Sequence, residues 1–339
     1  MNRRVRAFFT SIPLLCAVPI AHANTLTVTS FADSGAGTLR DAIASASSGD
    51  TIVFASDMAI VLASELTLNK DLTIDGSGRS VAVVGGNGVR AFYVNSGVVA
   101  QIKHLTLQNG NVTAANGFGG AIYNDANGTL TLTDCTLAYN AAYHAGAIFN
   151  IGTLSVVGST LYGNSAQNSG GAIYNTAGTL TVTNSTFANN SASADAGAVL
   201  NVGGTATSIN STFAGNSAAN GMDVYGTTSI TLINTIIADG CAGTIADGGG
   251  NLDSSTSCGF PAANSNIDPR LGPLQDNGGP TWTMAPLFGS PVVDAIDCTQ
   301  APPTDQRGIA RPQGAKCDIG AVESDRIFGD GFGLPPSHQ

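Results

Sequence analysis

The sequence predicts an all-β protein, a right-handed single-stranded parallel β-helix in which successive turns of the chain stack into a solenoid. A five-residue phrase that begins Gly-Ala and ends in Asn starts at Gly120, Gly146, Gly171 and Gly197. An alternating Thr-rich run at residues 129–133 returns at residues 179–183. A fixed period of about 25 residues is typical of a solenoid protein.

Each repeat is predicted to hold three short strands joined by tight turns. Thr alternates with Leu or Val at the two-residue period of a strand. Gly, Asn and Ser separate the strands, and these residues favour turns. Parallel strands joined by crossovers almost always follow a right-handed path. We therefore expect a right-handed coil whose turns stack at about 4.8 Å.

Two columns of asparagine run in step with the repeat. An Asn at a turn can satisfy backbone groups and bond the equivalent Asn one turn away. We interpret the columns as structural ladders, with a ligand-binding role as the alternative. The members are Asn124, Asn150, Asn175, Asn201, and then Asn140, Asn164, Asn190, Asn216.

The N-terminal residues 1–23 have the pattern of a secretory signal peptide. Arg3, Arg4 and Arg6 form a basic start, residues 8–20 are apolar, and the stretch closes on Ala-His-Ala. The apolar run is short and contains proline, so we do not expect it to span a membrane, and no transmembrane segment is predicted for the mature chain. The expected location is secreted or cell-surface.

Residues 24–50 are predicted to start and cap the coil. A first strand is expected at 25–30, and a short helix at 37–47 places Leu39, Ala42 and Ile43 on one face. Covering the first turn protects an open sheet edge. The coil itself is expected over 51–239, and its less regular early strands are predicted at 51–54, 59–62, 72–74, 81–84, 92–94 and 102–107.

A loop-rich C-terminal module is predicted over residues 240–324, followed by a tail at 325–339. Exported chains favour disulfides, and the late cysteines fall into two neighbouring pairs. We predict the bonds Cys241–Cys258 and Cys298–Cys317. Cys135 aligns with a column of serines and alternates with inward-facing Leu137, so it is predicted to be a buried free thiol.

Several of these segments resemble a known family. The Gly-Gly-Ala-Ile and Phe-x-x-Asn phrases are similar to repeats of polymorphic outer-membrane proteins. The whole chain resembles bacterial β-helix proteins of the choice-of-anchor Q type with a CSLREA-like N-terminus, although residues 37–42 lack the cysteine of that name. The resemblance implies a pectin lyase-like fold and export, and no defined activity. The matching segments are 26–29, 37–43, 72–76, 276–281, 289–291, 305–308 and 317–321.

The charge distribution argues against nucleic-acid partners. The formal net charge is −10, and there is no Lys or Arg between Lys103 and Arg270. Binding phosphates requires clustered cations. No cofactor is predicted, apart from an alternative in which residues 247–253, with two Asp and three Gly, bind Ca²⁺. The simpler interpretation of that segment is a glycine-rich loop.

No catalytic residue is predicted. Glycoside hydrolysis needs two carboxylates about 5–9.5 Å apart, whereas the Asp residues of the coil fall in different columns. His104 and His144 lie more than one repeat apart, with no nucleophile motif beside them. We interpret the chain as an exported or surface-associated scaffold, adhesin-like or binding a glycan or surface protein. The alternative is a polysaccharide lyase or glycoside hydrolase on the same fold.

One column of the repeat is aromatic. If the neighbouring Ile residues face inward, these rings form an external stripe that can stack on sugars. If the rings face inward, they belong to the core. The sequence leaves both arrangements open, and the column consists of Tyr123, Phe149, Tyr174 and Tyr225, interrupted by Leu200.

Overall fold

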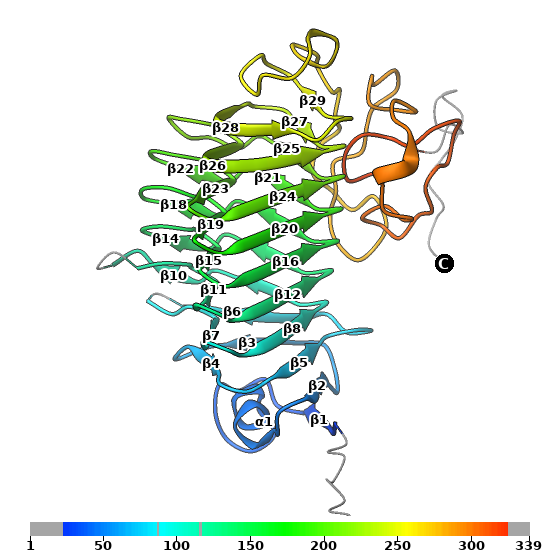
Figure 1. The fold of residues 1–339 in the computed structure, drawn as a ribbon. Helices are drawn as coiled ribbons and strands as arrows, with labels where there is room; N and C mark the ends of the chain where they lie inside the picture. The colour runs from blue at the N-terminus through cyan, green and yellow to red at the C-terminus, as the bar shows by residue number, and fades with distance from the viewer. Residues whose placement is uncertain (1–22, 87, 115–116, 325–339) are drawn as a thin grey trace, which may run out of the picture.

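The computed structural model describes residues 23–86, 88–114 and 117–324, so the expected leader (apart from Ala23) and the tail lie outside the described residues. The chain forms a right-handed parallel β-helix that rises from the N-terminal end to the yellow turns in Figure 1. The paired strands of the described residues are parallel throughout. The predicted fold class is confirmed.

The N-terminal end is closed by a helix and a first strand. β1 (Thr25–Val28) pairs with β2 (Asp50–Phe54), and between them α1 (Leu39–Ser45) buries Leu39, Ala42 and Ile43 against the coil. The Thr38 side chain accepts a hydrogen bond from the Asp41 amide, which caps the helix at its N-terminus. The helix thus covers the first turn as predicted, over a shorter range.

The largest sheet of the described residues has 16 strands and consists of two stacks joined by β26 (Val224–Ile233). After β2, the first stack contains β5 (Leu72–Asp75), β8 (Val99–Lys103), β12 (Thr129–Thr133), β16 (Thr153–Val157), β20 (Thr179–Thr183), β24 (Thr205–Ile209) and β28 (Cys241–Asp247). The second stack contains β4 (Leu66–Leu68), β7 (Phe92–Val94), β11 (Ile122–Asn124), β15 (Ile148–Asn150), β19 (Ile173–Thr176) and β23 (Val199–Val202).

Two further sheets close the turns. The second sheet contains β3 (Met58–Val61), β6 (Val81–Val84), β9 (Thr106–Gln108), β13 (Thr136–Ala138), β17 (Thr160–Tyr162), β21 (Thr186–Ala188), β25 (Thr212–Ala214), β27 (Ile236–Ile237) and β29 (Leu252–Asp253). The third sheet contains β10 (Asn111–Val112), β14 (Ala141–Ala142), β18 (Ser165–Ala166) and β22 (Ser191–Ala192).

The single strand predicted at 102–107 is wrong, because the chain turns between β8 and β9. His104 has a positive φ of 52°, which bends the chain at this corner. Equivalent corners of later turns have the same left-handed backbone at Asp134, Gly158, Asn184 and Asn210. Mostly Asn, Asp or Gly occupy these positions, and these residues tolerate that conformation best.

The core is a set of apolar columns running along the solenoid. The register places Ile122 beside Ile148, and Leu130 beside Leu154, with these four side chains buried. In the second sheet, Phe187 and Phe213 stack with ring centroids 4.7 Å apart. Because like residues lie over like, each turn buries its apolar face against the next.

The buried asparagines form two hydrogen-bonded ladders. In the first, each side-chain amide donates to the carbonyl oxygen of the Asn one turn on, at 2.6–2.7 Å from Asn124 through Asn201. In the second, the corresponding distances from Asn140 through Asn216 are 2.9–3.0 Å. The side chains also bond backbone groups, such as Asn175 Nδ2 to the Gly178 carbonyl at 3.0 Å.

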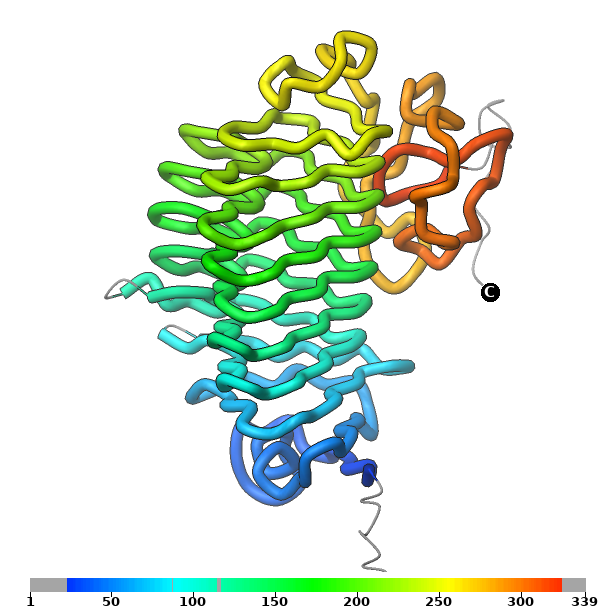
Figure 2. The backbone as a smooth tube through the Cα atoms, in the orientation of Figure 1, coloured from blue at the N-terminus to red at the C-terminus, as the bar shows by residue number. Residues whose placement is uncertain are grey.

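The C-terminal segment leaves the top of the coil and descends along its side, as the orange tube in Figure 2 shows. It holds two short 3₁₀ helices, η2 (Ala262–Asn264) and η3 (Cys298–Gln300). Both predicted disulfides, Cys241–Cys258 and Cys298–Cys317, are present. Cys135 is free and buried, also as predicted.

Replacing a ladder residue should weaken the fold. Asn175→Ala removes the acceptor for the Asn150 side-chain amide and the donor to the side-chain oxygen of Asn201 and the Gly178 carbonyl. Because these groups are buried, the free energy of unfolding should fall by about 1–3 kcal/mol. Urea titration measures this. The matched control is Thr179→Ala, an exposed position on β20, which should change stability by less than about 0.5 kcal/mol. Equal midpoints for the two variants would contradict a structural role for the ladder.

Candidate functional site

The outer face of the first stack presents rows of hydroxyl groups, which we name the threonine face. Inward Leu130 and Leu132 alternate with outward residues that are exposed or half-buried. Along a strand, outward side chains recur at about 6.7 Å, and between turns at about 4.8 Å. The face consists of Thr129, Thr131, Thr133, Thr153, Ser155, Thr179, Thr181, Thr183, Thr205 and Thr207.

The aromatic column lies on the outside of the second stack. Ile122, its neighbour in β11, is in the core, while Tyr123 is half-buried and stacks on Tyr93 of the preceding turn at 4.9 Å. Phe118 and His144 pack over the middle of the column, and Phe149 is 7% exposed. Of the predicted stripe residues, Tyr123, Phe149 and Tyr174 are brought together, with their rings packed on one another. Tyr225 lies in the same column but beyond Leu200, which separates it from Tyr174.

Charged groups close the lower end of this column. The Arg90 guanidinium lies 5.2 Å from the Tyr123 ring centroid and pairs with Glu65 at 2.5 Å. The Tyr93 hydroxyl donates to Asp125 at 3.0 Å. Burial, together with this carboxylate, raises the pKa of Tyr93 to about 12. These groups bind one another, which fixes the rings in place.

Sequence reasoning missed a cluster at the corner between β8 and β9. His104 Nδ1 lies 2.8 Å from Ser77 Oγ and 3.3 Å from Asp75, while its Nε2 lies 3.3 Å from Asp134. Burial raises the pKa of Asp134, and His104 partly offsets this. For Asp75, burial acts to raise the pKa, but the hydrogen bonds from Ser77 and the interaction with His104 together outweigh it, so the pKa is lowered.

The imidazole of His104 therefore bridges two carboxylates, one from the turn before its own and one from the turn after it. The alignment of His104 with Asp134 in one corner column was the available sequence signal. The partner Ser77 comes from an irregular turn, which no repeat phrase aligns. Chemically, the cluster brings together a hydroxyl, an imidazole and two carboxylates, although the imidazole fills the space between the carboxylates.

A second carboxylate pair ends one asparagine ladder. Asp223 is fully buried and accepts hydrogen bonds from Asn216 at 2.8 Å and the Asp239 amide at 2.8 Å. Burial, with the Asp239 carboxylate beside it, raises the pKa of Asp223 well above its usual range. Because Asp223 is buried away from solvent, we assign the pair a structural role: the two carboxylates accept the hydrogen bonds of Asn216, the last residue of the ladder.

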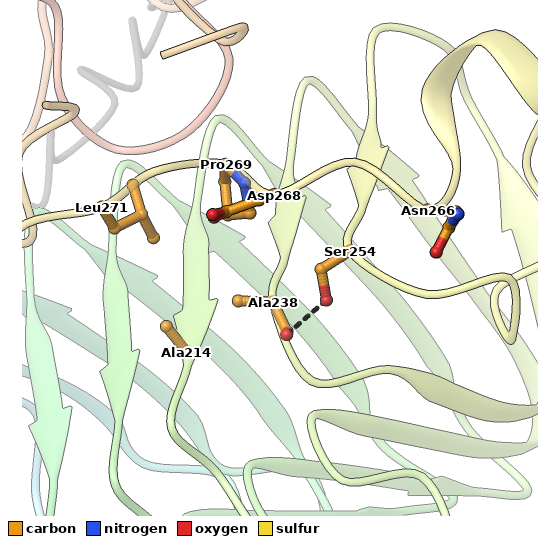
Figure 3. Close-up of a pocket in the computed structure, with 7 residues that line it drawn as sticks. All are labelled: Ala214, Ala238, Ser254, Asn266, Asp268, Pro269 and Leu271. Atoms are coloured by element: carbon orange, nitrogen blue, oxygen red, sulfur yellow. Dashed lines mark hydrogen bonds between the residues drawn. The ribbon is translucent and has the colours of Figure 1, made fainter. Parts of the chain in front are cut away.

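A pocket of about 540 Å³ lies between the second sheet and the descending C-terminal segment. In Figure 3, Ala214 and Ala238 project from the sheet toward Asp268, Pro269 and Leu271. Two of its polar side chains are already hydrogen-bonded, since Ser254 Oγ donates to the Ala238 carbonyl and Asp268 accepts from the Arg270 amide at 2.8 Å. The pocket is therefore a gap beside a docked segment.

The segment considered for Ca²⁺ turns its carboxylates onto its own chain. Asp247 accepts from Asn251 at 2.7 Å, and Asp253 accepts from the Ser255 and Cys258 amides at 2.8 and 3.0 Å. Among the described residues, no cluster of three or more His, Cys, Asp or Glu is arranged to hold a metal ion.

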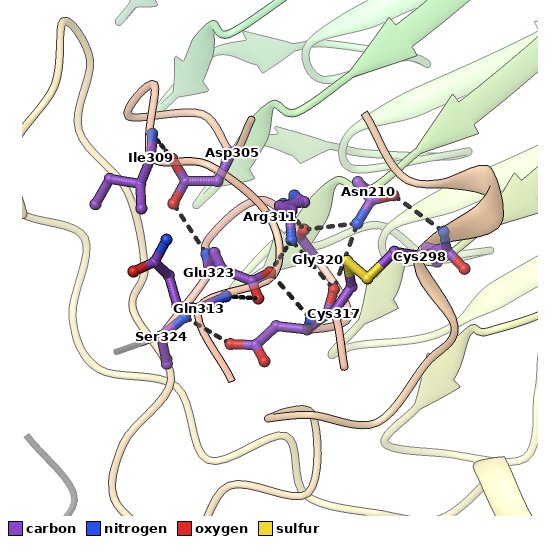
Figure 4. Close-up of polar contacts among 12 residues, drawn as sticks. Asn210, Cys298, Asp305, Ile309, Arg311, Gln313, Cys317, Gly320, Glu323 and Ser324 are labelled. Atoms are coloured by element: carbon purple, nitrogen blue, oxygen red, sulfur yellow. Dashed lines mark hydrogen bonds and ion pairs between the residues drawn. A yellow bond between two sulfur atoms is a disulfide. The ribbon is translucent and has the colours of Figure 1, made fainter. Parts of the chain in front are cut away.

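A buried polar network attaches the C-terminal module to the coil (Figure 4). Arg311 pairs with Glu323 at 2.7 Å, both side chains being at most 1% exposed, and Arg307 pairs with Asp305 at 2.8 Å. Arg311 also donates to Asn184 of the coil. Removing one member of a buried ion pair leaves the other charge buried and unpaired, which is strongly destabilising. We therefore assign these residues a role in stabilising the folded C-terminal module.

The similarity of this chain to known proteins is limited to solved structures of low sequence identity. No model of a known protein family matches the chain, and no curated protein does either. Pectate lyase Pel9A is 13% identical, with a TM-score of 0.46 over 90% of this chain and 98% of its own. Jun a 1, the major allergen from cedar pollen, is 18% identical, with a TM-score of 0.38 over 68% of this chain and 69% of its own.

In the part of the chain that the structure describes, no helix is long and apolar enough to cross a membrane.

The stability of the protein should depend on the ionisation of Asp223. Its folded pKa is raised, so the unfolded chain releases this proton first as pH rises above the ordinary value of 3.8. The free energy of unfolding should therefore fall as the pH rises from 3.8 toward the raised pKa of folded Asp223. Asp223→Asn should reduce this dependence of the unfolding free energy on pH. Denaturant titrations from pH 4 upward measure it, with Asp276→Asn at an exposed turn as the control. Parallel curves for wild type and Asp223→Asn would contradict this assignment.

Cys135 should be inert in the folded protein. Burial raises the pKa of its thiol to about 12, and reactive cysteines need an accessible thiolate. Iodoacetamide should label it in urea and leave it unlabelled in native buffer, as read by peptide mapping without reductant. Native labelling, or a disulfide to Cys135, would refute this.

Proposed function

We propose that this chain is an exported, non-catalytic β-helix scaffold of the choice-of-anchor Q kind, which binds an uncharged glycan at a cell surface. The predicted leader supports export, and the matching N- and C-terminal segments support the family. An adhesin-like role follows from a long, rigid rod that repeats the same outward side chains on successive turns.

The observation that carries this proposal is the threonine face. Four successive strands, β12, β16, β20 and β24, present aligned hydroxyls at Thr131, Ser155, Thr181 and Thr207. Hydroxyls both donate and accept hydrogen bonds, and the threonine methyl groups add apolar contact. A repeated array suits many weak contacts with a repeating ligand, which accumulate into useful affinity.

The charge of the coil favours a neutral ligand over an acidic one. Between Lys103 and Arg270 the sequence has no cation, and binding a uronate would require charge neutralisation at its carboxylate. In the C-terminal module, the side chains of Arg307 and Arg311 are already paired with carboxylates. Cellulose-like, mannan-like or glucan-like chains meet this requirement.

The alternative is a polysaccharide-active enzyme, and one observation favours it. The corner cluster of Ser77, His104 and Asp134 holds an imidazole within hydrogen-bond reach of both a hydroxyl and a carboxylate. Against it, Ser77 Oγ already donates to Asp75 at 2.5 Å, and the imidazole is shared between two carboxylates. We therefore assign the cluster to corner stability.

The purified mature chain should be retained by neutral polysaccharides without cleaving them. Affinity electrophoresis in gels containing hydroxyethyl cellulose, xyloglucan or galactomannan measures retention, and reducing-end and unsaturated-product assays measure turnover, with and without Ca²⁺. Turnover that is abolished by His104→Ala would overturn the proposal in favour of the enzyme. Absence of retention in every gel would overturn glycan binding.

A further inference from the structure

A second surface feature is a group of three aromatic rings, two of them exposed, which we name the ring platform. It consists of Tyr139 and Tyr162 from successive turns of the coil and Trp282 from the C-terminal module. Tyr139 lies 5.1 Å from Tyr162, and Tyr162 lies 5.8 Å from Trp282 in a nearly parallel arrangement, between ring centroids. Tyr139 is 58% exposed and Trp282 is 47% exposed. Tyr162 is half-buried and contacts both of the other rings, so the platform presents two exposed rings to solvent.

The backbone at Tyr139 is unfavourable for the residue it carries. Its φ is 54°, a left-handed conformation in which a bulky aromatic residue is an outlier. The equivalent positions of other turns carry residues suited to it, namely Asn109, Gly163, Asn189 and Gly215. Since the ring is exposed, packing in the core does not explain a tyrosine here, and such outliers concentrate at binding sites.

The next turn makes room for this ring. A side-chain carbon added at Gly163 would lie 2.8 Å from two atoms of the Tyr139 ring, closer than real contacts allow. Gly163 therefore lets the Tyr139 ring lie over the backbone of the next turn, beside Tyr162. The position of the ring is set by its surroundings.

The backbone around Trp282 is anchored by hydrogen bonds. Its neighbours Thr281 and Thr283 are buried, and Thr281 Oγ1 donates to the Gly158 carbonyl at 2.7 Å. The Trp282 carbonyl accepts hydrogen bonds from Thr160 Oγ1 and Gln306 Nε2. The indole thus projects from an anchored segment, so little conformational freedom remains to be lost on binding.

From this geometry we propose that the ring platform is a binding subsite for the pyranose rings of a neutral glycan chain. Aromatic faces offer sugars a flat apolar surface, and Tyr and Trp combine large contact area with few rotatable bonds. Arg307 follows Gln306, which donates to the Trp282 carbonyl. The Arg307 guanidinium is already bonded to Asp305 and the Glu323 carbonyl, which disfavours an acidic sugar. This inference rests on the proposed glycan binding and adds an aromatic subsite on a different sheet from the threonine face.

The chain offers a direct probe, because Trp282 is its single tryptophan. Titrating the mature protein with hydroxyethyl cellulose, xyloglucan and galactomannan should shift the Trp282 emission with at least one of them, whereas polygalacturonate should leave it unchanged. Tyr139→Asn should weaken binding roughly tenfold. That variant should fold as well as wild type or better, since Asn occupies the same conformation at Asn109 and Asn189.

Affinity electrophoresis extends the test to Trp282→Ala, with Phe31→Ala as the matched control, an exposed ring beyond β1 at the N-terminal end. Retention should fall in Tyr139→Asn and Trp282→Ala and stay unchanged in Phe31→Ala. Retention equal to wild type in both platform variants would overturn the subsite and leave the proposed function standing. A wild-type chain that no neutral glycan retains would overturn both, and preference for polygalacturonate would overturn the neutral ligand class.

Discussion

The alignment of each turn with the next is the constraint on which the rest of this structure depends. Buried amides such as Asn150 and Asn175 are satisfied in the ladder only when the equivalent residue lies directly above or below. A slip by one residue would reverse the faces of every strand and leave these groups unpaired in the core. The same alignment places threonine over threonine outside and isoleucine over isoleucine inside.

The ladder also shows how the coil is terminated. Asn216, the last amide of its column, meets the Asp223 carboxylate instead of another Asn. A carboxylate accepts hydrogen bonds from several amides at once, here including the backbone of Asp239 and Gly240. At the opposite end, α1 covers the open sheet edge with its apolar face. Each end therefore has a feature that the internal repeat lacks.

The sequence predicted most accurately what is periodic or local. The repeats, the Asn columns and the two disulfides depend on residues that recur in step or lie close along the chain. The corner of Ser77 and His104 was not predicted, because it lies in early turns with no repeat phrase to set the alignment. The docking of the C-terminal module onto the coil could not be predicted from the sequence either, because contacts such as Gln306 with Thr160 join residues 146 positions apart.

The ring platform could not be predicted for two reasons: its tyrosines occupy different positions in their repeats, and its tryptophan comes from a distant part of the chain. Tyr139 and Tyr162 stand in repeat phrases, yet their different offsets, one at the turn and one on the strand, conceal that their side chains meet. Trp282 comes from the module, whose path is set by tertiary contacts. The positive φ of Tyr139 has a sequence signature in retrospect, as a Tyr at a position that other repeats give to Asn or Gly.

The docking of the module has a mechanical consequence for the rod. In an unbraced solenoid each turn contacts its neighbours alone, so a pulling force can peel the turns apart one at a time. Here the module bonds Gly158, Asn184 and Asn210 on three different turns, and a disulfide closes the loop that carries Cys298. Those three turns must therefore unfold together. Under tension, the early turns between β5 and β9 should unravel first, while the braced upper half keeps its shape.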